Sequence, residues 1–332
     1  MPGMSSGSPA SGRWRPSPPT FLRLALASLA GLIVIFPSGA LVRLTDSGLG
    51  CPDWPGCNGE VIPPLSGHAW IEYSNRILSG LVVLVALAAW VAALRMPGAP
   101  GKLRRWAAVP AVAGVLQGPL GGLTVIFDLH PLLVSSHFLL SIVALGGGTL
   151  LALFARDHAQ ARHRGTDSRR AALAGGVALT LAGVIITGVL VTAAGPHSGD
   201  PAVIRRLGNL ADAAAIHVRV VIAFCVFAIA LGVWLLRNRP RDPLTMRLAT
   251  LFVPLLGLQI GLGEYQYRHR LPWGVVLAHV TVAGAVWTCG IAVAWLAAHP
   301  QNDPQQVRQG ELAPPTVRAL SDATAARQAS ST

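Results

Sequence analysis

The sequence predicts an all-α polytopic membrane protein in which eight transmembrane helices form two four-helix bundles related by a pseudo-twofold axis. Three observations predict this fold class: the composition, a series of long apolar segments and an internal repeat. Of the 332 residues, 52% are hydrophobic and 12% are charged, whereas soluble domains carry about 25% charged residues. This deficit of charge excludes a soluble globular enzyme.

Eight apolar segments are each long enough to cross a bilayer core of about 30 Å as a helix. Only helices suit such segments, because lipid offers no hydrogen-bond partner to an open backbone. The segments are residues 21–42, 71–94, 106–127, 132–155, 171–194, 213–236, 246–266 and 273–297. The first is too long for the apolar region of a signal peptide, so we expect it to remain as an uncleaved helix.

The positive charges predict the orientation of these helices. The net charge of +12 does not indicate nucleic-acid binding, because the arginines lie between the apolar segments. Alternate connections together with both termini contain 19 of the 26 Lys and Arg residues, which places both termini in the cytoplasm by the positive-inside rule. Residues 1–20 and 298–332 are expected to be disordered tails, and residues 156–170 a cytoplasmic linker.

The two halves of the chain repeat each other at a constant offset of 142 residues. Four pairs share this offset: Asn75 with His217, Gln117 with Gln259, Gly121 with Gly263, and His137 with His279. Each copy holds an even number of helices, so the copies are parallel repeats related by an axis along the membrane normal. We therefore expect one four-helix bundle over residues 21–155 and a second over residues 171–297.

The repeat brings His217 and His279 to similar depths, roughly 6–10 Å below the outer ends of their helices. Neutral imidazole is a good ligand for haem iron, and a haem takes one or two such ligands. Zinc usually takes three or four ligands, which the neighbouring sequence does not offer. We predict that this pair ligates a haem; the alternative is a pair of histidines that hydrogen-bond between helices.

The first half departs from this pattern at one position. His137 matches His279 in depth, but Asn75 stands where the second half has His217, and asparagine is a poor ligand for iron. A haem in the first half would be held by His137 alone or together with a substitute ligand. His68, seven residues before Asn75 on the same helical face, is a candidate for that substitute.

Glu72 and Arg76 lie four residues apart at the outer end of one helix. One interpretation is a structural ion pair. The other is a carboxylate that accepts or relays protons beside the first-half site. Gln117 and Gln259 are interpreted as residues that hydrogen-bond between helices.

Two of the four cysteines lie in the outer segment C-P-D-W-P-G-C, as Cys51 and Cys57. An oxidising compartment favours a disulfide between them; a redox-active thiol pair is the alternative, and a metal site would need further Cys or His nearby. Cys225 and Cys289 lie within helices, where we expect them to be packing residues.

The outer loop of residues 195–212 carries His197, Arg205 and Arg206. Arginines beside a haem near the outer face could pair with its propionates. The alternative interpretation is ordinary loop charge.

Taken together, several segments resemble the haem A synthases. They are S-G-L-G-C-P-D-W-P-G-C-N-G, I-E-Y-S-N-R, the Gln–Gly segments of the third and seventh helices, G-P-H-S-G-D, and the histidines of the fourth, sixth and eighth helices. The resemblance covers residues 21–297. It implies two related four-helix bundles and an oxidoreductase that converts haem O to haem A for terminal oxidases, by oxidising the C8 methyl group to a formyl group.

The resemblance also implies site residues and partners. The residues are His217 and His279 as axial ligands of a resident haem b, His137 near or on the iron of the substrate haem, Asn75 and Arg76 in the substrate-haem pocket, Glu72 as the catalytic residue, and Cys51 with Cys57 as the outer-loop pair. The expected surroundings are the lipid of a bacterial plasma membrane. A haem O synthase is an expected partner because haem O is insoluble, and the sequence leaves homo-oligomerisation open.

One departure from the family concerns the second helix, whose usual pattern is Glu-x-x-His-Arg. Here Asn75 replaces the histidine, so either the substrate iron has one protein ligand or the protein has lost activity. The retained Glu72, Arg76, His137 and cysteine pair favour the first reading. The rival functions are a non-enzymatic membrane cytochrome b that carries electrons and, from the repeat, a transporter.

Overall fold

The computed structural model describes residues 14–60, 67–197, 199–203 and 206–302. These residues contain eight helices: α1 (Pro18–Leu44), α2 (Gly67–Arg95), α3 (Gly101–Ile126), α4 (Pro131–Ala159), α5 (Ser168–Ala194), α6 (Leu210–Arg237), α7 (Pro243–Arg268) and α8 (Trp273–Ala298). All eight are long and apolar enough to cross a membrane, which confirms the predicted all-helical fold. Most of the two predicted tails, residues 1–13 and 303–332, lies outside the described residues.

Most of the helices begin a few residues before the apolar segments, because polar caps precede the hydrophobic run. Asp167 caps α5 by accepting bonds from the amides of Arg169 and Arg170 at 3.1 and 3.2 Å. Asn209 caps α6 in the same way. Such side chains satisfy amides that the first helical turn leaves without partners. The predicted linker at 156–170 is consequently helical at both ends.

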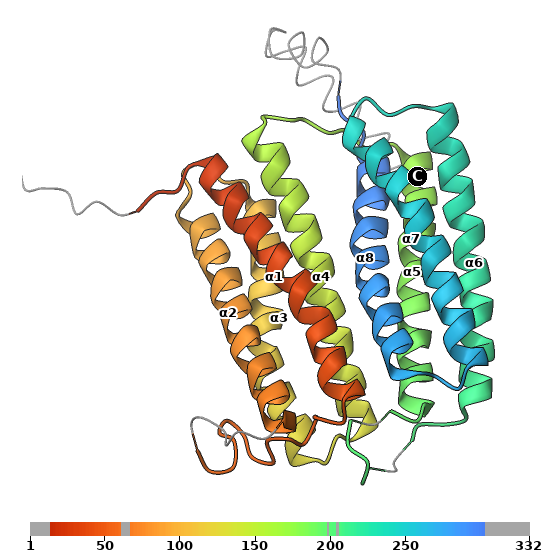
Figure 1. Ribbon diagram of the computed structural model, residues 1–332. Helices are drawn as coiled ribbons and strands as arrows, with labels where there is room; N and C mark the ends of the chain where they lie inside the picture. The colour runs from red at the N-terminus through yellow and green to blue at the C-terminus, as the bar shows by residue number, and fades with distance from the viewer. Residues whose placement is uncertain (1–13, 61–66, 198, 204–205, 303–332) are drawn as a thin grey trace, which may run out of the picture.

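The eight helices form two four-helix bundles that stand side by side (Figure 1). Neighbouring helices pack in the order α1–α2–α3–α4 in the first bundle, and α1 also packs on α4. In the second bundle α5 packs on α6 and α8, and α7 packs on α8. The bundles meet where α4 packs on α8, flanked by α1 on α8 and α4 on α5. The predicted pseudo-twofold axis relates α1 to α5 and α4 to α8. It therefore relates the α1–α8 contact to the α4–α5 contact.

Glycines on α4 allow this helix to pack closely on its neighbours. A Cβ atom at Gly147 would lie 2.4 Å from Val109 of α3, and one at Gly146 would lie 3.1 Å from the indole nitrogen of Trp287 on α8. That indole donates to the carbonyl of Ile142 at 3.1 Å. Small residues are the usual means by which membrane helices approach one another.

The two bundles differ on one side. In the first bundle α2 packs against α3, where a Cβ at Gly114 would lie 3.0 Å from Val83. Among the described residues, α6 and α7 share no extensive packing. The buried residues of α7 are Thr245 and Phe252, both in its N-terminal half. The second bundle is therefore more open between α6 and α7 than the first is between α2 and α3.

A charged cluster joins the ends of α4, α7 and α8 on the side predicted to be cytoplasmic. Asp242, the buried cap of α7, accepts from Arg156 at 2.9 and 3.0 Å and from Arg164 at 2.6 Å. Arg162 lies 3.1 Å from the same carboxylate. Burial of Asp242 acts to raise its pKa, but the bonds from Arg156 and Arg164 outweigh this and hold the pKa well below its usual range.

Candidate functional site

In the second bundle, His217 of α6 is oriented by a hydroxyl of α5. Thr187 Oγ1 lies 3.0 Å from His217 Nδ1. The Thr187 hydroxyl already donates to the carbonyl of Gly183 at 2.8 Å, so its oxygen accepts the proton of Nδ1. This leaves Nε2 of His217 with its lone pair, the arrangement found for metal-bound histidines whose other nitrogen is hydrogen-bonded.

His279 lies on α8 of the same bundle. Its Nδ1 is buried without a hydrogen-bond partner among the described residues. Its Nε2 lies 3.1 Å from the side-chain nitrogen of Gln259 on α7. Iron bound at Nε2 would take the place of that amide.

Glycines face three of the four repeat-related positions. A Cβ at Gly188 would lie 3.3 Å from His217 Cε1, and a Cβ at Gly263 would lie 3.1 Å from His279 Cε1. Both rings thus rest against the backbone of the neighbouring helix. This site fits a haem for three reasons. It offers the imidazoles of His217 and His279, the buried Nδ1 of His279 has no hydrogen-bond partner among the described residues, and the bundle is open between α6 and α7. No group of three or more His, Cys, Asp or Glu within the described ranges could hold a free metal ion.

In the first bundle His137 repeats the environment of His279. It lies on α4 beside Gly121 of α3, where a Cβ would be 3.3 Å from its Cε1. Its Nδ1 is likewise buried with no bonding partner in the described part of the chain. Gln117, however, donates to the His137 carbonyl at 3.0 Å and to Ser141 at 2.6 Å, not to the ring. Both glutamines thus hydrogen-bond between helices, as predicted.

Asn75 of α2 occupies the place that His217 has in the second bundle. Ser38 of α1 donates to Asn75 Oδ1 at 2.9 Å, just as Thr187 of α5 contacts the His217 ring. The segments S-G-A-L-V and T-G-V-L-V carry these hydroxyls at an offset of 149 residues. The offset is longer than 142 because the α1–α2 loop is seven residues longer than the α5–α6 loop.

Sequence reasoning missed Ser38 and Thr187. The signal was present, since a hydroxyl followed by glycine recurs in the first and fifth helices. Ser38 and Thr187 are 149 residues apart, because the longer α1–α2 loop follows Ser38. A comparison of the two halves at the single offset of 142 therefore does not pair them. His68, the candidate substitute ligand, instead has its Nδ1 2.9 Å from the hydroxyl of Ser47 in the outer loop.

Glu72 and Arg76 hold the cysteine loop on the N-terminal end of α2, the end that the charge pattern predicts to be the outer one. Glu72 Oε2 accepts the amide of Cys51 at 2.7 Å, and Oε1 accepts from Arg76 at 2.6 Å. Arg76 also donates to backbone carbonyls of Asp53 and Gly56 at 3.1 and 2.7 Å. The ion pair exists as predicted, and it has a structural role in addition to any chemical one.

The predicted disulfide is present, with a bond of 2.02 Å between the sulfurs of Cys51 and Cys57. The loop that it closes reaches across to α3. A Cβ at Gly122 would lie 2.7 Å from the ring of Trp54, so glycine is required for this contact. The loop therefore covers the outer end of the first bundle between α2 and α3.

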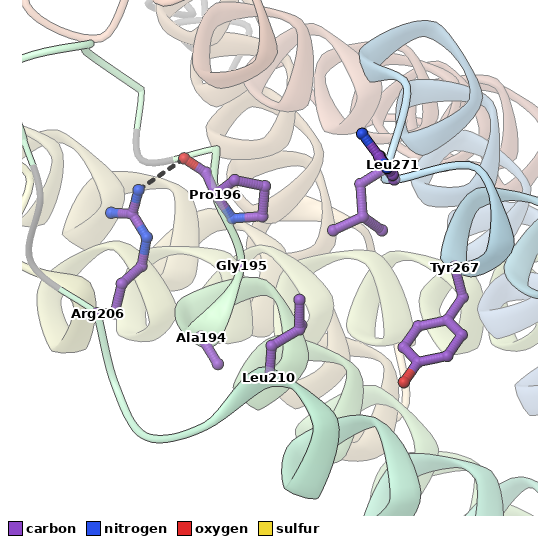
Figure 2. A pocket seen from close by; sticks show the side chains of 8 residues that line it. Ala194, Gly195, Pro196, Arg206, Leu210, Tyr267 and Leu271 are labelled. Carbon is purple, nitrogen blue, oxygen red and sulfur yellow. Dashed lines mark hydrogen bonds between the residues drawn. The ribbon is translucent and has the colours of Figure 1, made fainter.

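The second bundle has a pocket at its outer end. It measures about 460 Å³ and is lined by residues that include Arg206, Leu210, Tyr267 and Arg270 (Figure 2). Arg206 donates to the carbonyl of Pro196 at 2.8 Å. Arg206 thus lines a pocket whose other walls include the first residue of α6 and the last turn of α7. Arg205 lies outside the described residues.

Hydrogen bonds join the loops at this end of the molecule, both within the second bundle and between the two bundles. His197 Nε2 lies 2.9 Å from the carbonyl of Leu271, which ties the α5–α6 loop to the α7–α8 loop. The amide of Gly48 donates to the carbonyl of Gly199 at 2.9 Å. His197 is therefore a loop contact and is not grouped with the helix histidines.

Comparison with known proteins places this architecture in a family. A family model described as "Cytochrome oxidase assembly protein" (COX15-CtaA) matches residues 22–70 and 65–291. A protein of Shewanella oneidensis named "Heme A synthase" is 33% identical over 155 residues, which is 41% of this chain and 44% of that protein.

Two further relatives carry the same name. The one from Alkalihalophilus pseudofirmus is 38% identical over 141 residues, covering 40% of this chain and 46% of its own length. The one from Bacillus licheniformis is 33% identical over 133 residues, covering 39% and 43%. The chain thus spans less than half the length of these curated relatives. The family model, by contrast, runs through all eight helices, and the chain belongs to the COX15-CtaA family of cytochrome oxidase assembly proteins.

Proposed function

We propose that this protein is a haem A synthase, an oxidoreductase that converts the C8 methyl group of haem O to the formyl group of haem A for terminal oxidases. The observation that carries the proposal is the family match through residue 291, which includes His137, His217 and His279. The relatives named "Heme A synthase" support the same reading. In overall balance the methyl group and one water molecule give the formyl group, four electrons and four protons. Two successive hydroxylations form a geminal diol, which loses water to leave the aldehyde, and the electrons pass to an acceptor outside this chain.

The second bundle is the proposed site of a resident haem b. His217 and His279 would be its axial ligands, with Thr187 holding the His217 ring. When bound, this haem supplies one-electron transfer to or from the reaction centre. The open side between α6 and α7 supports the assignment, as does the buried Nδ1 of His279.

The first bundle is the proposed site of the substrate, haem O. His137 would hold its iron, with Asn75 and Arg76 in the surrounding pocket. The farnesyl tail of haem O is apolar, so lipid is the proposed route of entry. A haem O synthase is the proposed donor, because direct handover spares the substrate exposure to water.

Glu72 is proposed to accept protons released during oxidation of the methyl group. Each of its carboxylate oxygens accepts one hydrogen bond, from Cys51 and from Arg76. An ionised carboxylate has about four acceptor positions, so it retains capacity for a proton. The two existing bonds fix its orientation at the outer end of α2.

The proposed orientation places both termini in the cytoplasm and the disulfide loop outside. The excess of Lys and Arg in alternate connections supports it. The disulfide supports it as well, because disulfides persist on the oxidising side of a bacterial plasma membrane.

The proposal is tested by identifying the haems in the purified protein. The chain is produced together with a haem O synthase, purified in detergent, and its haems are extracted and identified by chromatography and mass. We expect haem b together with haem O, a hydroxylated haem O or haem A. His217→Ala and His279→Ala should each lose haem b, whereas His269→Ala, at the exposed end of α7, should retain it. Haem b alone in the parent protein would instead indicate an electron-carrying cytochrome b.

A further inference from the structure

The pocket beside Arg206, here called the α6–α7 pocket, has basic and polar walls. Arg206 and Arg270 line it together with Tyr267, Leu210 and Leu271. Arg206 and Tyr267 lie on opposite sides of it (Figure 2). None of the lining residues, all of which belong to the described part of the chain, is Asp or Glu. The walls of the pocket therefore offer these two guanidinium groups no carboxylate.

Arg270 brings a positive charge that the described residues do not neutralise. Its side chain has no hydrogen bond or ion pair with any of them. The hydroxyl of Tyr267 likewise has no hydrogen-bond partner in the described ranges. Arg268, by contrast, pairs with Glu264 one turn earlier on α7. A cation and a hydroxyl donor are thus available to an anion in the α6–α7 pocket.

Arg206 is held in the opposite wall by the backbone. It donates to the carbonyls of Pro196 and Val203 at 2.8 and 3.2 Å. These bonds orient its guanidinium group. The planar fork of a guanidinium group matches the oxygens of a carboxylate or a phosphate, so two arginines in one pocket favour an anionic group of that kind.

The pocket lies on the same helices as the proposed ligands of haem b. Leu210 precedes His217 by seven residues on α6, which is two turns or roughly 10 Å along one helical face. Tyr267 follows Gly263 by one turn on α7, and Gly263 faces the ring of His279. In the described chain, α6 and α7 share no extensive packing. A molecule with its anionic group in the pocket can therefore place an apolar part between these two helices.

We propose that the α6–α7 pocket binds the anionic head of an amphiphile through Arg206, Arg270 and the hydroxyl of Tyr267. Two sources offer this chemistry. One is the propionate carboxylates of the haem b proposed for this bundle, and the other is the phosphate of a membrane lipid. The first source rests on the proposed function, whereas the second does not.

The haem source is tested by changing the arginines and the carboxylates together. The full chain is produced in cells that cannot make haem, purified, and titrated with haem b or with its dimethyl ester, which has no free carboxylate. If the propionates occupy the pocket, Arg270→Gln and Arg206→Gln should each weaken haem b binding about tenfold. Binding of the ester should be unchanged in both variants, which also shows that they are folded.

The lipid source is tested by native mass spectrometry of the same proteins. Each is mixed with phosphatidylglycerol or with diacylglycerol of the same acyl chains, which lacks the phosphate. If a lipid phosphate occupies the pocket, the parent protein should retain phosphatidylglycerol in preference, and Arg270→Gln and Arg206→Gln should lose that preference. Arg268→Gln is the matched control for both tests, because Arg268 is exposed and does not line the pocket.

The outcomes separate the two sources and the two proposals. An effect of the arginines on haem b but not on its ester assigns the pocket to the propionates. A preference for phosphatidylglycerol that depends on the arginines assigns it to a lipid. If neither arginine variant differs from Arg268→Gln in either test, the pocket is not an anion site, while the proposed function stands. If the parent protein binds no haem b, the proposed haem site fails, and the lipid test alone decides this inference.

Discussion

At the residue scale, the site depends on how each imidazole is held as much as on the imidazoles themselves. Thr187 and Ser38 occupy matching places on α5 and α1, and each contacts the repeat-related residue of the next helix. The first contact orients the ring of His217, the proposed haem ligand, and the second occupies the side-chain oxygen of Asn75. The exchange of His for Asn therefore changes the chemistry of the position without removing its hydrogen-bond partner.

Thr187→Val should weaken haem b binding. It removes the acceptor for His217 Nδ1, and loss of such a partner typically lowers metal affinity about 10–100-fold. The measurement is the haem b retained per protein during gel filtration, together with its midpoint potential. Thr187→Ser should restore both.

Thr180→Val is the matched control for that change, because Thr180 makes the same bond to a carbonyl of α5 four residues earlier and has no hydrogen bond to a histidine of the described ranges. If Thr187→Val keeps the haem b content and the midpoint potential of the parent protein, Thr187 does not position His217.

Glu72→Gln should lower the yield of haem A while haem b is retained. The amide keeps an oxygen to accept the Cys51 amide, but it loses the charge and the capacity for proton transfer. The measurement is the ratio of haem A to haem O in the purified variant. Glu264→Gln is the control, because Glu264 also pairs with an arginine four residues later but is exposed. A normal rate of haem A formation in Glu72→Gln would remove the proton-handling role.

At the element scale, the disulfide loop is attached to two helices by different means. Arg76 and Glu72 bind it to α2 through polar contacts, and Trp54 packs it on α3 at Gly122. The second bundle has the pocket beside Arg206 at the corresponding end. The longer first loop thus accounts for the covered end of one bundle and the more open end of the other.

Gly122→Val should displace the loop, because its side chain would overlap the Trp54 ring. We expect Cys51 and Cys57 to be reduced and alkylated faster under mild reductant, as measured by mass. Gly118→Val is the control on the same helix, since a Cβ at Gly118 meets nothing within 4 Å. Equal rates of alkylation in the two variants would contradict the proposed contact.

The helices could be predicted from sequence because membrane crossing imposes length and apolar character on each one. The paired positions of the histidines followed from the repeat. The bond from Cys51 to Glu72 could not be predicted, because it depends on how the loop folds back over α2. The opening between α6 and α7 also escaped prediction, because the sequence does not show which faces of these two helices pack against each other.

At the scale of the whole molecule, the two bundles are fixed to each other at both ends. The outer end uses backbone bonds between loops, such as that from Gly48 to Gly199. The other end uses the charged cluster around Asp242, in which three arginines surround one buried carboxylate. If each bundle holds a haem, as proposed, these connections would hold the two haem sites at a constant separation.

Asp242→Asn should destabilise the protein strongly, because Arg156, Arg162 and Arg164 lose a buried carboxylate partner. Asp157 then remains as the partner of Arg164. Breaking a buried ion pair in this way costs about 3–5 kcal/mol. The measurement is thermal unfolding in detergent. Asp167→Asn removes an exposed carboxylate paired with Arg170, and such a pair is worth about 0–1 kcal/mol. Equal unfolding temperatures for the two variants would contradict a stabilising role for the cluster.

The same carboxylate predicts a direction of pH dependence. The folded pKa of Asp242 lies below its usual value, so its contribution to stability is present above the unfolded pKa of about 3.9. It is lost as the pH falls towards the folded pKa. The parent protein should therefore unfold more easily in acid, and Asp242→Asn should reduce that dependence.

The most direct test of the central claim is the haem composition of bacterial membranes that lack any other haem A synthase and contain a haem O synthase. Adding this chain should produce haem A, which is absent when the haem O synthase is present alone. If the membranes contain this chain with haem b bound, and haem O accumulates with no haem A, the chain does not carry out the proposed oxidation.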